Sequence, residues 1–234
     1  MADTTPVQNL NSVNLSLLLD DAVTGGDNGI AAAADGEPFT ATKRNAYLHQ
    51  AYRWLVQKLV ESFGITRASD LLPGFVATQD VTFSASGVTL NKNYMFPLRL
   101  YKASAGGGFM LSKRSSLTDD DFSPFISNFY VIEAGKLYAY QRTSGTLAIL
   151  AAGTGTLFYL KADRKDVTTG AEVASNTAPD TTVDGWAIDA SVYYAAGAAC
   201  LDKSIIDNDP EWASKGNRFM AMAMEKLPKT KLIP

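Results

Sequence analysis

Between Asn45 and Gly64 the chain carries its most regular apolar pattern, in the stretch NAYLHQAYRWLVQKLVESFG. Large apolar side chains recur there every three or four residues, which places them on one face of an α-helix. These residues are Leu48, Tyr52, Leu55, Leu59 and Phe63. Ala51 would let a neighbouring backbone approach this face, and Gly64 is a typical helix end. The pattern predicts an amphipathic helix over residues 42–64 that packs against other helices.

The periodicity changes from helical to alternating over residues 79–163. Short runs rich in β-branched and aromatic residues, such as VTFSASGVTL and FYVIEAGKLYAYQ, are separated by Gly, Ser and Asn. Glu133–Lys136 and Thr143–Thr146 have the composition of hairpin turns, which join antiparallel strands. Pro97 lies inside one run, and it predicts an edge strand or the end of that strand's pairing. We therefore expect an antiparallel β-sheet or a small β-sandwich in this region.

Helical patterns return near the C-terminus. Asp184 is the expected N-cap of a helix over residues 186–206, whose centre YYAAGAACL is rich in small residues and would let a partner helix pack closely. Asp209 and Pro210 mark the start of a helix over residues 210–226, because proline at the first helical position loses no hydrogen bond. The two patterns together predict a C-terminal helix pair.

The remaining segments connect or extend these elements. A mobile N-terminus is expected at residues 1–12, a short helix at 13–23 and a long loop at 164–183. Residues 227–234, LPKTKLIP, are expected to form an extended tail, because Pro228 interrupts helical hydrogen bonding. The predicted fold is one α+β domain over residues 13–226, in which an inserted antiparallel β-sheet or small β-sandwich interrupts a helical bundle.

Composition disfavours several classes of protein. The formal net charge of −3 and the isoelectric point near 5.2 argue against a protein whose main task is to grip nucleic acid. Cys200 is the only cysteine, which excludes an intrachain disulfide and a cysteine zinc site. The longest apolar run, residues 192–201, is about half as long as a membrane-spanning helix. We therefore expect a soluble protein without a membrane partner.

No group of residues forms a convincing catalytic, cofactor or metal site. His49 is the single histidine, and no serine or cysteine motif accompanies it as a nucleophile. Asp119–Asp121 bring carboxylates together, but adjacent acids more often form a solvated turn than a calcium site or a glycosidase pair. The glycine-rich stretches SAGGGF and AAGTGTLF lack the lysine-containing end of a phosphate-binding loop. We expect no catalytic residue, no cofactor and no metal ion.

The order of these motifs resembles that of the head–tail adaptor (connector, or gateway) proteins of tailed bacteriophages. The similarity begins at LSLLLDD and continues in FTATKRNAYLHQAYRWLVQKL, where His49 stands at a position that is often asparagine in the family. Matches to the family's phrase are Tyr47, Leu48, Ala51, Arg53 and Leu55. NYMFPLRLYKA resembles a tyrosine–x–x–proline strand of these proteins, and GKLYAYQ with GTLFYLKADR resembles a later hairpin. The long loop after Asp163 departs from a minimal adaptor.

The resemblance implies a non-enzymatic structural protein of the virion. Such a protein is made in the bacterial cytoplasm and forms a ring, expected to be a dodecamer, in the neck between head and tail. Its expected partners are the portal protein, downstream tail or nozzle proteins and further copies of itself, and viral DNA passes through without sequence-specific binding. The C-terminal segment of adaptors reaches between portal subunits. This assigns portal binding to Leu227, Lys229, Lys231, Leu232 and Ile233.

Other functions stay open at this point. The chain could be a different neck or tail component, such as a tail-completion or stopper protein. It could also be a tail-associated glycan hydrolase that uses Asp119–Asp121, or a carbohydrate-binding β module built on the aromatic strands. Lytic activity on cell-wall material would favour the hydrolase, whereas a gene position beside a portal or capsid gene would favour the adaptor.

Overall fold

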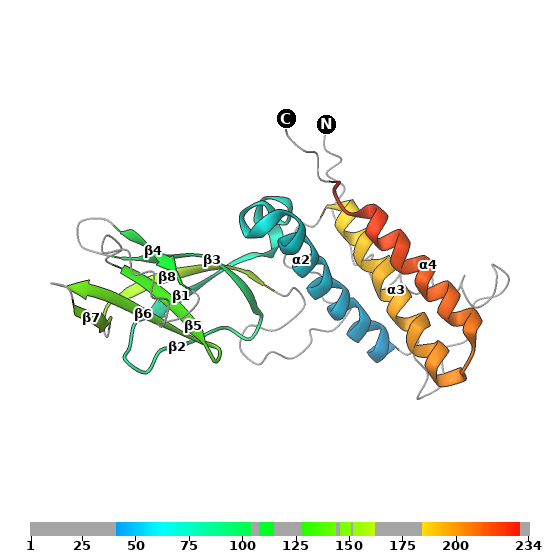
Figure 1. Cartoon of the computed structure of the whole chain (residues 1–234), viewed down its shortest axis with the longest axis horizontal. Helices are drawn as coiled ribbons and strands as arrows, with labels where there is room; N and C mark the ends of the chain where they lie inside the picture. Colours follow the sequence, from blue (N-terminus) through cyan, green and yellow to red (C-terminus); the bar gives the residue numbers. More distant parts are fainter. Residues whose placement is uncertain are drawn as a thin grey trace. The chain divides into compact units, whose positions relative to one another are not determined.

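The computed structural model describes residues 41–103, 108–114, 128–143, 146–150, 152–161 and 184–229. These residues form two compact units: residues 41–75 and 184–229 make a helical unit, and residues 76–161 make a sheet unit (Figure 1). The fold is α+β, with a long helix first, a curled sheet second and a helix pair last, in the order that the sequence predicts. The predicted segments at 1–12, 13–23 and 164–183 lie outside the described residues.

Helix α2 (Ala41–Leu71) is longer than the predicted 42–64. Gly64 has a φ of 79° and a ψ of 165°, a non-helical conformation that divides α2 into two segments. Glycine suits this conformation because it has no Cβ, so the predicted helix end at Gly64 is correct for the first segment. The prediction missed the second segment, which runs to Leu71 and is followed by the 3-10 turn η1 (Pro73–Phe75).

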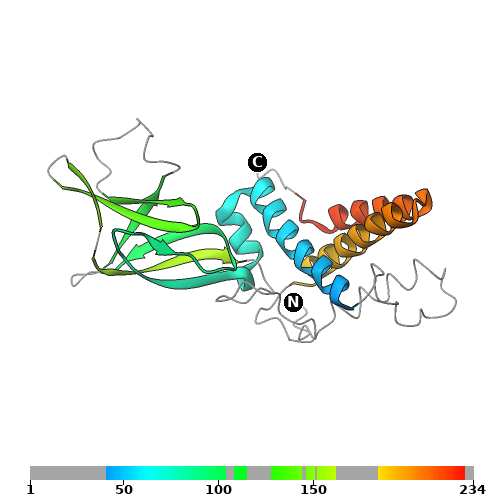
Figure 2. The same cartoon turned by 90° about the horizontal axis from the view of Figure 1, so that it is seen from below.

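The predicted apolar face of α2 is buried. Leu48, Tyr52, Leu55 and Leu59 are fully buried, whereas Phe63 is only half-buried. Helix α2 packs against α3 (Gly185–Asp207), and the two helices lie side by side in both views of the helical unit (Figures 1 and 2). The buried face therefore forms the centre of the helical unit.

Helices α3 and α4 (Pro210–Lys226) form a close hairpin, and their bounds agree with the predicted ones to within one residue. Gly197 of α3 and Gly216 of α4 lie at the contact. A Cβ atom on Gly197 would lie 3.1 Å from the Gly216 carbonyl oxygen, and one on Gly216 would lie 3.0 Å from the Gly197 carbonyl oxygen. The small residues of α3 thus allow the close packing that the sequence predicts.

The two predicted N-cap aspartates behave differently. Asp209 Oδ1 accepts a hydrogen bond from the Glu211 amide at 2.8 Å, with Pro210 in the first turn, so this cap is confirmed. Asp184 occupies the N-cap position, but its side chain makes no capping hydrogen bond. Its Oδ2 accepts from the Trp186 indole at 3.2 Å instead. Asp184 is therefore the N-cap of α3, as predicted, but its carboxylate bonds to the indole and not to a helical amide.

The sheet unit has eight strands in the order β1-β8-β3-β4-β5-β6-β2, and β7 pairs with β6. Their bounds are β1 Val76–Thr82, β2 Val88–Thr89, β3 Tyr94–Lys102, β4 Phe109–Lys113, β5 Asn128–Glu133, β6 Lys136–Thr143, β7 Thr146–Ile149 and β8 Thr154–Lys161. The pairs are antiparallel except β4 with β5, where Ser112 pairs with Phe129 in parallel. The sheet is therefore mixed, where the sequence predicts an antiparallel one.

Both predicted hairpins are present. Ala134 and Gly135 have φ values of 48° and 74° and join β5 to β6, and β6 pairs with β7 through Thr143 and Thr146. Pro97 lies in β3 opposite Tyr159 of β8, next to a register shift. Within the described residues, β3 pairs with β4 only through its residues 100–102. Pro97 therefore lies where one side of β3 is an edge, and its missing N–H disrupts no ladder on that side.

The sheet is curled (Figure 2). Hydrogen bonds show that its outer strands β1 and β2 approach each other. Gln79 of β1 bridges them: its Nε2 donates to the Thr89 carbonyl oxygen at 2.8 Å, and its Oε1 accepts from the Asn91 amide at 2.9 Å. The Tyr159 hydroxyl donates to Asn93 Oδ1 at 2.9 Å and accepts from Asn91 Nδ2 at 3.0 Å. The curled sheet thus encloses its own core, which includes Val81, Phe83, Leu100, Leu111, Tyr130 and Leu157.

Candidate functional site

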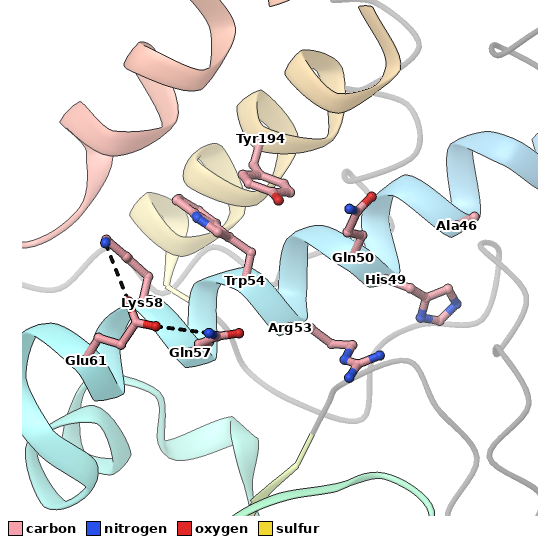
Figure 3. A pocket seen from close by; sticks show the side chains of 9 residues that line it. All are labelled: Ala46, His49, Gln50, Arg53, Trp54, Gln57, Lys58, Glu61 and Tyr194. Carbon is pink, nitrogen blue, oxygen red and sulfur yellow. Dashed lines mark hydrogen bonds and ion pairs between the residues drawn. The ribbon is translucent and has the colours of Figure 1, made fainter. Parts of the chain in front are cut away.

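A polar groove of about 520 Å³ runs along α2 beside α3 (Figure 3). Glu61 organises one end of it, where the carboxylate accepts from Gln57 Nε2 at 3.0 Å and pairs with Lys58 Nζ at 3.5 Å. The Trp54 ring stacks on Tyr194 of α3, with ring centroids 4.4 Å apart. The full lining is Ala46, His49, Gln50, Arg53, Trp54, Gln57, Lys58, Glu61 and Tyr194. Amides and charges of both signs suit contact with a polar surface better than capture of an apolar small molecule.

The lining of the groove lacks the aliphatic hydroxyl and thiol side chains that serve as nucleophiles in many hydrolases. His49, the single histidine, is buried at its edge, and the lining contains no serine, threonine or cysteine. Within the described residues, no three His, Cys, Asp or Glu side chains come together as a metal site. Asp119–Asp121, the candidate glycosidase residues, lie outside the described residues.

Tyr47 ties the first part of α2 to the end of α3. Its hydroxyl donates to Asp202 Oδ2 at 2.8 Å. Burial, and then the hydrogen bond to this carboxylate, raises the pKa of Tyr47 far above its ordinary value. The phenol therefore stays protonated, and remains a hydrogen-bond donor to α3, at alkaline pH values where an exposed tyrosine would ionise.

A recess of about 300 Å³ lies where α4 ends. We call it the tail recess, and its lining is Lys58, Ser62, Phe63, Met224, Leu227, Pro228 and Lys229. Leu227 is the C-cap of α4 with an extended backbone, and its N–H donates to the Met224 carbonyl oxygen at 3.3 Å. The helix therefore ends before Pro228, as the sequence predicts. Phe63 is half-buried, and its ring contributes to this recess.

The tail recess contains part of the predicted portal-binding set. The structure brings Leu227 and Lys229 together there, with Leu227 half-buried and Lys229 exposed. Lys231, Leu232 and Ile233 lie outside the described residues. No local sequence pattern predicts the recess itself, because Phe63 and Leu227 meet only when α2 and α4 belong to one packed unit.

The turn between α3 and α4 forms a second surface feature, the hairpin tip, defined as residues 205–209. Ile205 and Ile206 at the end of α3 are 79% and 59% exposed. The turn that follows them is held tightly, because the Asn208 amide donates to the Ser204 carbonyl oxygen and the Asp209 amide donates to the same oxygen at 3.1 Å. The hairpin tip therefore presents two stiff, β-branched side chains to solvent on a fixed backbone.

The sheet unit has its own exposed features. The Arg99 guanidinium lies 4.3 Å from the centroid of the Phe158 ring, and the exposed Tyr101 and Met110 are cross-strand partners on β3 and β4. Four aromatic strand residues are instead buried: Phe129, Tyr130, Tyr140 and Tyr159. A buried ring cannot stack on a sugar, so these residues do not support the interpretation of the sheet as a carbohydrate-binding module.

Comparisons with known proteins assign no family. No protein-family model matches the chain, and no curated protein matches it. None of the helices in the described part of the chain combines the length and the apolar character that crossing a membrane requires. Function is therefore inferred from the sequence motifs and from the surfaces of the helical unit.

Proposed function

We propose that this protein is a head–tail adaptor, a non-enzymatic structural component of a tailed-bacteriophage virion. The observation that carries the proposal is the construction of the helical unit. Chain segments from both sides of the inserted sheet unit, α2 and the α3–α4 hairpin, pack into one body from which the C-terminal tail leaves. This is the order of elements that the sequence resemblance implies. In this role a ring of copies, expected to be a dodecamer, lies under the portal and extends the DNA channel.

The C-terminal tail is the proposed portal-binding segment. It starts at Leu227 and Lys229 on the rim of the tail recess and continues to Leu232 and Ile233. Burial of these last two side chains between portal subunits contributes about 3–6 kcal/mol before the cost of ordering the tail is subtracted. Lys229 and Lys231 meet an acidic rim, which speeds and orients docking more than it tightens it.

The remaining surfaces serve assembly and DNA passage. One of the two units, helical or sheet, offers the platform for downstream tail or nozzle proteins. A formal net charge of −3 is consistent with a channel wall that lets phosphates slide past without holding them. The proposal requires no cofactor and no sequence-specific contact with viral DNA.

Electron microscopy tests the proposal directly. Purified protein is mixed with the portal protein encoded in the same genome, and the complexes are imaged and averaged. The expected result is a ring of this protein on one end of the portal. Portals that stay bare at every ratio and salt concentration would contradict the proposal.

Deletion of residues 230–234 tests the role of the tail. The variant keeps all of α4 and the recess residues Leu227 and Lys229, so its melting temperature should stay close to that of the full chain. Attachment to the portal should be lost, because Leu232 and Ile233 are absent. The control is Lys92→Ala in the sheet unit, which removes an exposed lysine outside the proposed contacts and should still attach. Normal occupancy of the portal by the truncated protein would exclude the tail as the anchor.

A further inference from the structure

We propose that the hairpin tip of one copy inserts into the tail recess of the next copy, so that subunits join head to tail. This inference rests on the proposed function, because it names the contact that would close an adaptor ring. It requires an apolar projection and an apolar recess at different places on the same unit, with complementary charge around them.

The exposed apolar side chains of the helical unit lie at these two places. Among the described residues, the large hydrophobic side chains exposed on this unit are Ile205, Ile206 and Met224. The two isoleucines form the hairpin tip, and Met224, which is 48% exposed, lines the tail recess together with Phe63 and Leu227. Single exposed apolar residues are common on protein surfaces. Here two of them lie together at the hairpin tip, and the third lines the tail recess.

The hairpin tip is ordered before it binds. Ser204 accepts both turn amides, and Lys203 Nζ pairs with Asp207 Oδ2 at 2.9 Å across one turn of α3. Isoleucine has few rotamers, so docking loses little conformational entropy. A projection that is already ordered binds more tightly than a flexible loop of the same composition.

Charge favours the pairing of these two surfaces. The end of α3 and the start of α4 carry Asp202, Asp207, Asp209 and Glu211 against Lys203 and Lys215. Lysines line the recess at Lys58 and Lys229. Lys58 pairs with Glu61 at 3.5 Å, whereas Lys229 has no ion pair with any residue that the structure describes. An acidic tip therefore meets a recess whose rim still holds an uncompensated positive charge.

The two surfaces lie at opposite ends of α4. This helix has 17 residues and is about 26 Å long at 1.5 Å per residue, so the tip cannot reach the recess of its own copy. A contact between different patches of identical subunits is heterologous, and it generates a closed ring when the rotation between neighbours closes. Because Leu227 and Lys229 line the recess, the inserted tip would also fix the direction in which each tail leaves.

Site-directed crosslinking between two full-length variants tests the contact. Ile206→Cys places a thiol on the tip, and Ser62→Cys places one at the exposed rim of the recess. The native Cys200 is buried and can remain. A mixture of the two variants with a short bismaleimide, with and without portal, should give covalent dimers about tenfold faster than a control mixture of Ile149→Cys and Ser62→Cys. Ile149 is an exposed isoleucine on β7, 39% accessible, and lies outside the proposed contact.

Substitutions give a second readout. Ile205→Ser with Ile206→Ser should reduce self-association, measured by sedimentation, by about tenfold or more, whereas Ile149→Ser should not. Lys229→Glu in the Ser62→Cys chain should slow crosslinking, and Asp207→Lys in the Ile206→Cys chain should restore it. Equal crosslinking of the test and control mixtures, with portal and without, would overturn the contact.

The outcomes separate this contact from the proposed function. Rings on the portal without tip-to-recess crosslinks would leave the adaptor function in place and exclude this interface. Tip-to-recess crosslinks in a protein that never binds the portal would support the interface and contradict the adaptor function.

Discussion

At the scale of single residues, Leu55 and Arg53 show how sharply environment changes around α2. Leu55 is 0% exposed and lies on the predicted apolar face, whereas Arg53 is exposed on the wall of the polar groove. The leucine is surrounded by packed side chains, so its removal leaves a cavity that the neighbours fill only in part. The arginine extends into solvent and holds few contacts that folding depends on.

We expect Leu55→Ala to lower the free energy of unfolding by about 2–5 kcal/mol. Arg53→Ala should change it by no more than about 0.5 kcal/mol, because surface substitutions seldom exceed that. Urea denaturation followed by circular dichroism measures both values. Similar, small effects at the two positions would mean that the buried face of α2 is assigned incorrectly.

At the scale of elements, the distance between α3 and α4 is set by a pair of glycines. A Cβ atom on Gly216 would lie 2.8 Å from Leu201 Cγ and 3.0 Å from the Gly197 carbonyl oxygen. A side chain there must push the helices apart or displace Leu201. By contrast, a Cβ atom on Gly185, in the first turn of α3, would meet no atom within 4 Å.

Gly216→Val should therefore destabilise the protein by about 1–3 kcal/mol or more through overpacking, although valine has the better helix propensity. Gly185→Val is the matched control and should stay within about 0.5 kcal/mol of the parent. Thermal unfolding followed by circular dichroism compares the three proteins. Equal melting temperatures for the two variants would show that the glycine contact does not limit helix packing.

Elements with local signals could be predicted from the sequence, and those set by distant partners could not. Helix α4 follows from Asp209 and Pro210, whose cap and first turn are properties of neighbouring residues. The parallel pairing of β4 with β5 is not made by a tight turn between neighbouring strands, so no local sequence pattern predicts it. The helical segment beyond Gly64 was missed because this glycine ends one segment and permits a second to follow.

The candidate surfaces were harder to predict than the elements. The start of the tail at Leu227 was correct because Pro228 is a local signal. Ile205 and Ile206 continue an apolar helix in the sequence, and only the folded unit shows that nothing described packs over them. The tail recess likewise requires Phe63 and Met224 to meet, a contact between residues far apart in the chain.

At the scale of the whole molecule, the two units can be followed by different signals. The three tryptophans are Trp54, Trp186 and Trp212, and all lie in the helical unit. Burial raises the pKa of Tyr130 in the sheet unit from 10.0 to about 12. Burial likewise raises the pKa of Cys200 in the helical unit from 9.0 to about 11. Of these two groups, Cys200 has the lower pKa and therefore loses its proton first as the pH rises. Tryptophan fluorescence reports on the helical unit, which contains Cys200.

These raised pKa values make stability fall at alkaline pH. The unfolded chain loses the Cys200 proton near 9.0, whereas the folded chain keeps it until about 11. Above pH 9 the unfolded state therefore binds fewer protons than the folded state, and the free energy of unfolding decreases as pH rises. Below pH 9 this contribution is fully present, so stability should not depend on the thiol there.

We therefore expect the melting temperature from tryptophan fluorescence to be unaffected by the thiol below pH 9 and to fall between pH 9 and 11. Cys200→Ala should reduce the slope, most clearly between pH 9 and 10, because the tyrosines begin to contribute only from their ordinary pKa of 10.0 upward. The variant loses some stability at every pH because the smaller side chain leaves space in the core, so the slope is the quantity to compare. Parallel curves for the parent and the variant over this interval would show that Cys200 ionises as readily in the folded unit as in the unfolded chain.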